Sequence, residues 1–237
     1  MRPLVLLAIL AAACAPDGRG PGIDTDRALG HVAVLAAHPR PGDSAGSRAA
    51  ADYIRAQVPG LEELRVGSVM LPEITVMGAT YRTAHRIDTT DPDLVIRFGP
   101  PGKALLVMAH YDTVLVSPGA VDNAAAVAVL IELARVLRET PPAIPVMLAF
   151  TANEEIGLVG AEALAEQRGK EVELAIALDL IGGSGDLSLN GASELIGRAE
   201  MGWLASAADR AGVVVRAPLP HRVVSRWWPQ AAWSAAW

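Results

Sequence analysis

From Lys103 onward, continuous apolar runs alternate with longer segments in which apolar residues recur at helical spacing. The apolar runs cover residues 103–109, 144–150 and 173–181, and the helical segments cover residues 123–137 and 157–166. Continuous apolar strands are typical of a parallel sheet buried on both faces, and their alternation with helices is typical of βαβ units. The pattern therefore predicts an α/β fold: a single domain with a mixed, mostly parallel β-sheet and helices on both faces.

The residues before Lys103 follow other patterns. Apolar residues at helical spacing predict helices over Thr25–Ala37 and Ala45–Val58, and the stretch between them is rich in helix breakers. Asp43 or Ser44 could cap the second of these helices. Short strand-like runs at residues 64–71, 73–77 and 94–98 predict an antiparallel edge of the sheet.

The N-terminus carries the features of an export signal. Arg2 precedes an apolar run from Leu4 to Ala13, which is too short to span a bilayer. The run ends at Cys14, and this arrangement resembles a bacterial lipoprotein signal in which the cysteine carries the lipid. A cleaved signal with an incidental cysteine is the alternative. We expect a signal peptide at residues 1–14, a linker rich in Gly and Pro at 15–22, a single folded domain at 23–237, and a periplasmic or extracellular location with a lipid anchor at Cys14.

The composition limits the partners of the protein. The chain has 237 residues, of which 51% are hydrophobic, so it can bury one sizeable core but not two. The net charge is -6 and the basic residues are dispersed, which gives no basic face for nucleic acid. With a single cysteine the chain has no internal disulfide, so its core and any bound metal must stabilise the fold. The sequence sets no expectation about the oligomeric state.

Ionisable side chains follow each of the three predicted core strands. The carboxyl ends of parallel strands meet at one edge of a sheet, where ligands bind, so we expect these side chains to converge. One imidazole and several carboxylates without a thiolate suit zinc or manganese. The candidate residues are His110 and Asp112 after the first strand, Asp122 at the start of the following helix, Glu154 and Glu155 after the second strand, and Asp179 after the third.

Spacing along the chain indicates roles for two pairs of these residues. His110 and Asp112 lie two positions apart on an extended chain, so they can share a face, and Asp112 could accept the second N–H of the imidazole. The adjacent Glu154 and Glu155 diverge in an extended segment. One of them can therefore bind a metal while the other contacts a water, as metal-activated hydrolysis requires.

Each candidate also has an ordinary interpretation. His110 could be a polar strand end, Asp122 a helix N-cap and Asp179 a turn former, while Glu154 and Glu155 could favour a helix dipole. Together, however, these residues concentrate negative charge at one edge of the sheet. We therefore expect a cation to neutralise that charge.

Four motifs carry a resemblance to a known family: MAHYDTV at residues 108–114, SPGAVDNAAAVAVLIELAR at 117–135, FTANEEIGLVGA at 150–161 and ALDLIGGSGDLSLNG at 177–191. They resemble the exported zinc exopeptidases with two co-catalytic metal ions, of the bacterial leucyl aminopeptidase type, whose relatives include glutaminyl cyclases. The resemblance runs from about His31 to the end of the chain, and residues 38–54 look like the helical N-terminal segment of the family.

The resemblance implies a division of roles among the candidate residues. His110 and Asp179 would bind the first zinc ion, Glu155 the second, and Asp122 would bridge the two. Glu154 would be the general base. From its spacing alone, Asp112 is the second candidate catalytic residue, which would orient the imidazole of His110. The resemblance also implies a cis peptide bond between Asp122 and Asn123.

The last residues depart from the family pattern. In members of the family, the corresponding strand ends in an arginine, a proline and a Ser-Asp-His run whose histidine completes the second zinc site. When Arg226, Pro229 and Ser234 are placed on that pattern, Ala235 and Ala236 stand where Asp and His are expected. His221 is the only nearby histidine and lies out of register. We therefore expect a weakly held second zinc ion and a catalytic domain that is incomplete at its C-terminal end.

These observations predict a zinc-dependent aminopeptidase that acts outside the cytoplasm. Its substrate would be a peptide with a free N-terminus, hydrolysed by metal-activated water. One alternative is a glutaminyl cyclase-like acyltransferase, and another is a catalytically impaired envelope binding protein of the same fold. A leucine anilide and a peptide with an N-terminal glutamine would distinguish the two enzymes.

Overall fold

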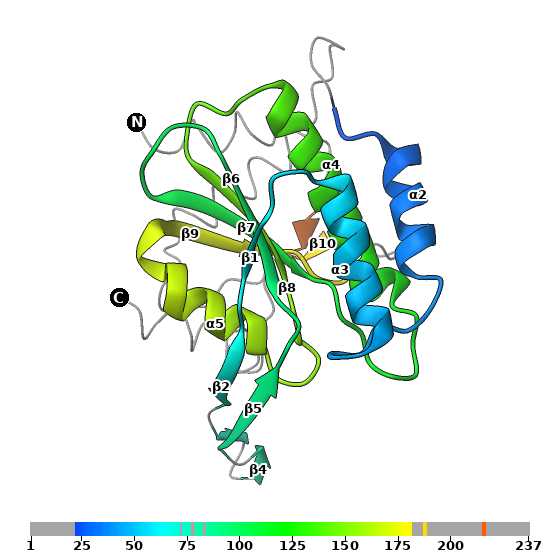
Figure 1. The fold of residues 1–237 in the computed structure, drawn as a ribbon, viewed down its shortest axis with the longest axis vertical. Helices are drawn as coiled ribbons and strands as arrows, with labels where there is room; N and C mark the ends of the chain where they lie inside the picture. The colour runs from blue at the N-terminus through cyan, green and yellow to red at the C-terminus, as the bar shows by residue number, and fades with distance from the viewer. Residues whose placement is uncertain are drawn as a thin grey trace.

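The computed structural model describes residues 22–71, 73–76, 79–82, 84–181, 187–188 and 215–216 of the chain. At its centre is a five-stranded sheet with the strand order β1-β6-β8-β7-β9 (Figure 1). Strands β7, β8 and β9 are parallel to one another, β6 is antiparallel to β8, and β1 is antiparallel to β6. The prediction of a mixed sheet with a parallel core is confirmed. The strands are β1 (Glu62–Leu64), β6 (Asp93–Phe98), β7 (Ala104–His110), β8 (Val146–Thr151) and β9 (Val172–Ala177).

Helices cover both faces of this sheet, as the continuous apolar strands predict. Figure 1 shows α2, α3 and α4 on one side and α5 on the other. The side chains of β7 point alternately to the two faces of the sheet. Leu105 and Val107 pack with the first group of helices, whereas Leu106 and Met108 pack with α5. All of β7 is therefore buried. The helices are α2 (Thr25–Leu35), α3 (Ala45–Gln57), α4 (Ala125–Glu139) and α5 (Val159–Arg168).

Ser44, rather than Asp43, caps α3. The hydroxyl of Ser44 accepts the N–H of Ser47, and the hydroxyl of Ser47 accepts the N–H of Ser44, which is a reciprocal capping box. Asp43 has φ 57° and its carboxylate accepts hydrogen bonds from Thr89 and Thr90 instead. This carboxylate therefore ties the start of α3 to the segment that leads into β6.

The antiparallel part of the chain is more divided than the sequence predicts. The expected strand at residues 64–71 is two strands, because Gly67 has φ 70° and the chain turns between β1 and β2 (Gly67–Leu71). Two separate antiparallel ribbons follow, and the pattern missed one strand of each. The ribbons pair β2 with β5 (His85–Thr89) and β3 (Ile74–Val76) with β4 (Ala79–Arg82); η2 (Gly169–Glu171), β10 (Leu187–Ser188) and β11 (Val215–Arg216) complete the described elements.

A buried carboxylate attaches α2 to α4. Glu132 of α4 accepts hydrogen bonds from the main-chain N–H of Asp24, which caps α2, and from the side chains of Arg27 and Arg135. Arg135 also donates to the carbonyl oxygen of Gly22. The first described residues are thereby held against the core by charged hydrogen bonds.

The predicted signal peptide at residues 1–14 lies outside the described residues, as do most of the linker and the whole tail from His221. Among the helices that the structure does describe, none combines the length and the apolar composition that crossing a membrane requires.

Candidate metal centre

Three side chains from three elements converge at the carboxyl edge of the parallel strands. His110 is the last residue of β7, Asp122 lies in a short turn η1 (Ala120–Ala124) before α4, and Asp179 follows β9. Nε2 of His110 is 3.2 Å from Oδ1 of Asp122 and 3.6 Å from Oδ1 of Asp179. One ligand atom from each residue falls within 4.8 Å of the others. The predicted convergence of these three residues is thus present in the structure.

The polar atoms at this point lack partners. Nε2 of His110 and Oδ1 of Asp179 are both buried without a hydrogen bond. Because buried polar atoms in folded proteins are nearly always hydrogen-bonded, two adjacent buried atoms without a partner indicate that a ligand binds between them. One imidazole nitrogen and two carboxylates form a donor set that suits zinc, which accepts nitrogen and oxygen ligands. The residues therefore fit a bound divalent metal ion.

Asp112 orients the imidazole of His110. Nδ1 of His110 is hydrogen-bonded to the carbonyl oxygen of Asp112 at 3.2 Å, and Oδ1 of Asp112 is 3.5 Å away. A proton on Nδ1 satisfies this contact and leaves the lone pair of Nε2 directed at Asp122 and Asp179. The expectation that Asp112 lies behind the imidazole agrees with this geometry, although its main-chain oxygen is the nearer acceptor.

The electrostatics of His110 favour a cation at this position. Burial alone lowers the pKa of His110, but the carboxylates of Asp112, Asp122 and Asp179 outweigh burial and raise the pKa well above its usual value. In physical terms, three acidic groups around one nitrogen stabilise positive charge there. A metal ion supplies the same charge.

Asp112 has a second role that the sequence did not reveal. Its two carboxylate oxygens accept the main-chain N–H groups of Glu154 at 2.9 Å and Glu155 at 3.1 Å. The side chain thus joins the end of β7 to the loop after β8, and the residue is only 1% exposed. No spacing pattern signals this contact, because the residues lie far apart in the chain.

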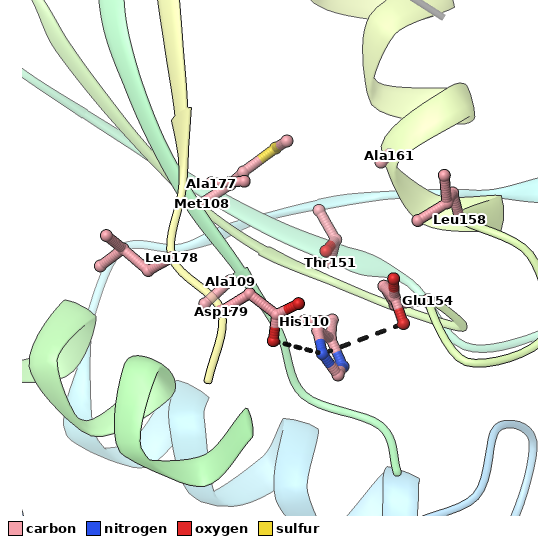
Figure 2. Close-up of a pocket in the computed structure, with 10 residues that line it drawn as sticks. All are labelled: Met108, Ala109, His110, Thr151, Glu154, Leu158, Ala161, Ala177, Leu178 and Asp179. Carbon is pink, nitrogen blue, oxygen red and sulfur yellow. Dashed lines mark ion pairs between the residues drawn. The ribbon is translucent and has the colours of Figure 1, made fainter. Parts of the chain in front are cut away.

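Glu154 and Glu155 occupy a turn, so the expectation of an extended segment is wrong. The carbonyl oxygen of Glu154 accepts the N–H groups of Gly157 and Leu158, which closes the turn. Oε2 of Glu154 is 4.0 Å from Nε2 of His110. Figure 2 shows the carboxylates of Glu154 and Asp179 directed at the His110 ring from opposite sides. Glu155 is not part of the three-residue ligand group.

The two glutamates differ from ordinary surface carboxylates in their pKa values. Burial raises the pKa of Glu154 to about 7; the charges of Asp112, Asp179 and Glu155 also raise it, against the opposing effect of His110. Burial, followed by the charge of Asp122, raises the pKa of Glu155. A carboxyl group with a pKa near neutrality can accept a proton and return it at physiological pH.

The ordinary interpretation of Asp122 as the N-cap of α4 is wrong. Asp122 has φ -116° and ψ 87°, and the residue directly before α4 is Ala124. Glu154 and Glu155 precede α5, which begins at Val159. The peptide bond between Asp122 and Asn123 is cis, as the family resemblance predicts.

A side-chain hydrogen bond links the two aspartates of the centre through their neighbours. Nδ2 of Asn123, directly after Asp122, donates to the carbonyl oxygen of Leu178 at 2.8 Å. Leu178 directly precedes Asp179. This single contact therefore fixes the start of α4 relative to the end of β9.

A small cavity opens beside the centre, on the α5 side of the sheet (Figure 2). Its polar end consists of His110, Glu154, Asp179 and Thr151. The remainder of its wall is apolar and is lined by Met108, Ala109, Leu158, Ala161, Ala177 and Leu178. A molecule bound at the polar end would therefore have an apolar surface beside it.

The predicted departure at the C-terminus, which involves Arg226, Pro229, Ser234, Ala235 and Ala236, lies outside the described residues, as does His221.

Comparison with known proteins assigns the chain to a class. Residues 94–224 match the sequence profile of Peptidase family M28. Because the match covers more than half of the chain, the chain belongs to this peptidase family. The resemblance to zinc exopeptidases that the motifs indicate is thereby confirmed.

Two curated relatives and two solved structures are similar to the chain. Aminopeptidase YwaD of Bacillus subtilis is 39% identical over 82 residues, which cover 33% of this chain and 18% of that protein. An aminopeptidase of Pseudomonas aeruginosa is 31% identical over 147 residues, which cover 52% of this chain and 27% of that protein. The chain therefore spans less than a third of the length of either relative.

The structural comparisons confirm the fold. The aminopeptidase from Aneurinibacillus sp. strain AM-1 superposes with a TM-score of 0.70 at 14% identity, covering 96% of this chain and 85% of that chain. A glutaminyl cyclase of Bacteroides thetaiotaomicron superposes with a TM-score of 0.64 at 17% identity, covering 92% of this chain and 82% of that chain. Since both chemistries occur on this fold, the activity must be argued from the site.

Proposed function

We propose that this chain is a zinc-dependent aminopeptidase, which hydrolyses the N-terminal peptide bond of peptides. The observation that carries the proposal is the meeting of His110, Asp122 and Asp179 around a buried, unpartnered imidazole nitrogen, with the Glu154 carboxylate 4.0 Å from that nitrogen. Membership of a peptidase family and the similarity to two aminopeptidases support it.

The first zinc ion would be held by His110, Asp122 and Asp179. When bound, it supplies a Lewis acid that polarises the scissile carbonyl and lowers the pKa of a coordinated water. Glu155 is the candidate ligand of a second ion, which we propose to be held more weakly because Glu155 stands outside the three-residue group.

Glu154 is the proposed general base. Its carboxylate takes a proton from the attacking water and passes it to the leaving amine, a transfer for which a pKa of about 7 is suited at neutral pH. The carboxylate of Asp112 accepts the main-chain N–H of Glu154, and the main-chain carbonyl oxygen of Asp112 is hydrogen-bonded to Nδ1 of His110. Asp112 therefore fixes the base relative to the imidazole.

The place of action belongs to the same proposal. Residues 1–14 have the pattern of an export signal, and Cys14 is the candidate site of lipid attachment. We propose that the enzyme acts outside the cytoplasm, anchored to the cell envelope. Intact-mass measurement of the protein purified from membranes, compared with a Cys14→Ala variant, tests the lipid.

The activity is tested with two substrates and one variant. The zinc-loaded chain is incubated with a leucine anilide and with a peptide carrying an N-terminal glutamine. We expect hydrolysis of the anilide to leucine and the free aniline. We expect Glu154→Gln to lose at least about a hundredfold in turnover with unchanged zinc content, because the amide keeps the shape but accepts no proton. Cyclised glutamine peptide without release of the aniline, or full turnover by Glu154→Gln, would contradict the proposal.

A further inference from the structure

One arginine outside the metal centre contacts both ends of the loop that joins two of its candidate ligands. The loop covers residues 111–119 and connects His110, at the end of β7, to η1, which contains Asp122. Arg40 lies in the segment between α2 and α3 and is only 2% exposed. A charged side chain is rarely buried to this extent unless its polar atoms have partners.

The guanidinium of Arg40 donates to main-chain carbonyl oxygens at the two ends of the loop. At the first end, Nε donates to the carbonyl oxygen of Tyr111 at 2.8 Å. At the second end, Nη1 donates to that of Pro118 at 2.7 Å and Nη2 to that of Gly119 at 3.3 Å. Nη1 also donates to the carbonyl oxygen of Leu35, the last residue of α2. One rigid, planar group thus sets the separation of the two loop ends.

The main chain of Arg40 adds two contacts near the start of the loop. Its N–H donates to the Thr113 hydroxyl at 2.8 Å, and its carbonyl oxygen accepts the N–H of Thr113 at 3.1 Å. Arg40 therefore contacts the loop at its start, at Thr113 and at its end.

Gly119 connects the guanidinium of Arg40 to η1, the turn that contains Asp122. Its carbonyl oxygen accepts both Nη2 of Arg40 and the N–H of Ala124, the last residue of η1. A Cβ at this position would lie 2.2 Å from the carbonyl oxygen of Asp122, 2.3 Å from Cγ2 of Thr113 and 3.2 Å from Nη2 of Arg40. With φ 59°, the position also favours glycine. The loop, the arginine and the turn are therefore in direct contact.

The charge of Arg40 faces the acidic side of the centre. Burial lowers the pKa of Arg40 to about 10, against the opposing effects of Asp112 and Asp122. The guanidinium therefore stays charged at neutral pH. Among the ion pairs of the described residues, none contains Arg40, so the side chain is held by carbonyl oxygens while its charge acts on the two aspartates over a longer distance.

We propose that Arg40 is a positioning residue of the metal centre: by holding both ends of the 111–119 loop, it sets the spacing of His110 and Asp122 and thereby the zinc affinity. The inference rests on the proposed function for the identity of the metal, and it adds a residue that contacts neither the metal nor the substrate. Lysine cannot replace arginine in this role, because its donors radiate from one nitrogen and cannot reach separated carbonyl oxygens.

The test compares zinc affinity among single variants of the full chain, measured by competition with a chromophoric chelator. We expect Arg40→Lys to bind zinc at least about tenfold more weakly than the wild type, in the range known for residues that orient metal ligands. Arg40→Gln should be weaker still, because its shorter side chain carries a single NH₂ group, which cannot reach the carbonyl oxygens at both loop ends. Arg48→Gln is the matched control: Arg48 is an exposed arginine of the same region with one carbonyl contact, to Asp43, and its affinity should be unchanged.

A second variant keeps the test decisive if Arg40→Lys or Arg40→Gln fails to fold, which circular dichroism of the zinc-free protein detects. Thr113→Val removes the hydroxyl that accepts the N–H of Arg40 and leaves the guanidinium intact. We expect it to weaken zinc binding less than Arg40→Lys does. If Arg40 had a purely structural role, its variants would have lower thermal stability but normal zinc affinity in the folded protein, and that result would overturn the inference. If the Arg40 variants do not fold, wild-type zinc affinity in Thr113→Val would overturn it.

The outcomes for this inference and for the proposed function are separable. Wild-type affinity in a folded Arg40→Lys variant that cleaves the anilide overturns the positioning role alone. A wild-type chain that binds zinc but cleaves no anilide overturns the aminopeptidase activity alone. A wild-type chain that binds no zinc overturns both.

Discussion

Nε2 of His110 lies 3.2 Å from Oδ1 of Asp122 without forming a hydrogen bond, although the imidazole is buried. We expect Asp122→Asn to lower the zinc affinity at least about tenfold, because the variant keeps the size of the side chain and removes its negative charge. Chelator competition measures the change. Asp52→Asn, which alters an exposed carboxylate of α3, is the control. Unchanged affinity and stoichiometry in Asp122→Asn would show that Asp122 is not a ligand.

The second prediction concerns Asp112, which accepts the N–H groups of both Glu154 and Glu155. In Asp112→Asn, the amide must turn its NH₂ group toward one of the two main-chain N–H groups, which leaves that partly buried N–H without an acceptor. We expect a loss of about 1–3 kcal/mol in the free energy of unfolding of the zinc-free protein.

Asp112→Asn should also change kcat and KM to different extents. The loop that carries Glu154 loses its anchor, so we expect a lower kcat for anilide cleavage with a smaller change in KM. Urea unfolding and steady-state kinetics measure the two effects. Wild-type kcat at saturating zinc would rule out a positioning role for Asp112.

The sequence predicted most reliably those features that depend on one strand and its last residue. The apolar run ending at His110 gives both a strand buried on two faces and the edge where ligands bind, because the two properties follow from the same parallel topology. The positions of His110, Asp122 and Asp179 were therefore predictable without coordinates.

Contacts between loops could not be predicted, because no local period reports them. Asp112 reaches the N–H groups of Glu154 and Glu155 across the sheet edge, and Arg40 reaches carbonyl oxygens at Tyr111 and Gly119 from the segment between two helices. In the sequence, Arg40 belongs to a stretch of helix breakers and has no feature that marks it.

The third prediction concerns the attachment of α2 to the core through Glu132. The Glu132 side chain is fully buried and accepts hydrogen bonds from Asp24, Arg27 and Arg135. We expect Glu132→Ala to cost about 2–4 kcal/mol in the free energy of unfolding, somewhat less than a fully buried pair, because Arg27 and Arg135 can reach water.

A neighbouring glutamate provides the control for Glu132→Ala. Glu139 pairs with the same Arg135 at 3.1 Å but is half exposed. Glu139→Ala should cost less than about 1 kcal/mol, as exposed ion pairs do. Urea unfolding of the zinc-free protein compares the two. Equal costs would mean that burial of Glu132 adds nothing to the attachment of α2.

The fourth prediction concerns Asp93, the first residue of β6, whose side chain is completely buried. Its Oδ1 accepts the N–H of Ala152 at 2.9 Å, and its Oδ2 has no hydrogen-bond partner. Burial, with a smaller effect of the Asp112 charge, raises the pKa of Asp93 from 3.8 to about 7, against the opposing hydrogen bond from Ala152. The phenol of the nearby Tyr111, whose pKa burial also raises, stays neutral throughout this range.

The raised pKa of Asp93 sets the sign of a pH effect on stability. Between about pH 4 and pH 7 the folded protein keeps a proton that the unfolded chain loses, so rising pH favours unfolding, and the full loss is reached above pH 7. The shift of about three units corresponds to at most about 4 kcal/mol. Asp93→Asn cannot ionise, so we expect its stability relative to wild type to increase as the pH rises from 5 to 8.

Urea unfolding at several pH values tests the Asp93 prediction. The measurements use zinc-free protein with excess chelator, because zinc binding is itself pH-dependent. The wild type and Asp93→Asn share all other ionisable groups, including Asp112 and Tyr111, so the difference between their free energies of unfolding isolates Asp93. If the difference between wild type and Asp93→Asn did not change with pH, Asp93 would have to titrate in the folded protein at the same pH as in the unfolded chain. Burial without a second hydrogen bond would then not govern its ionisation.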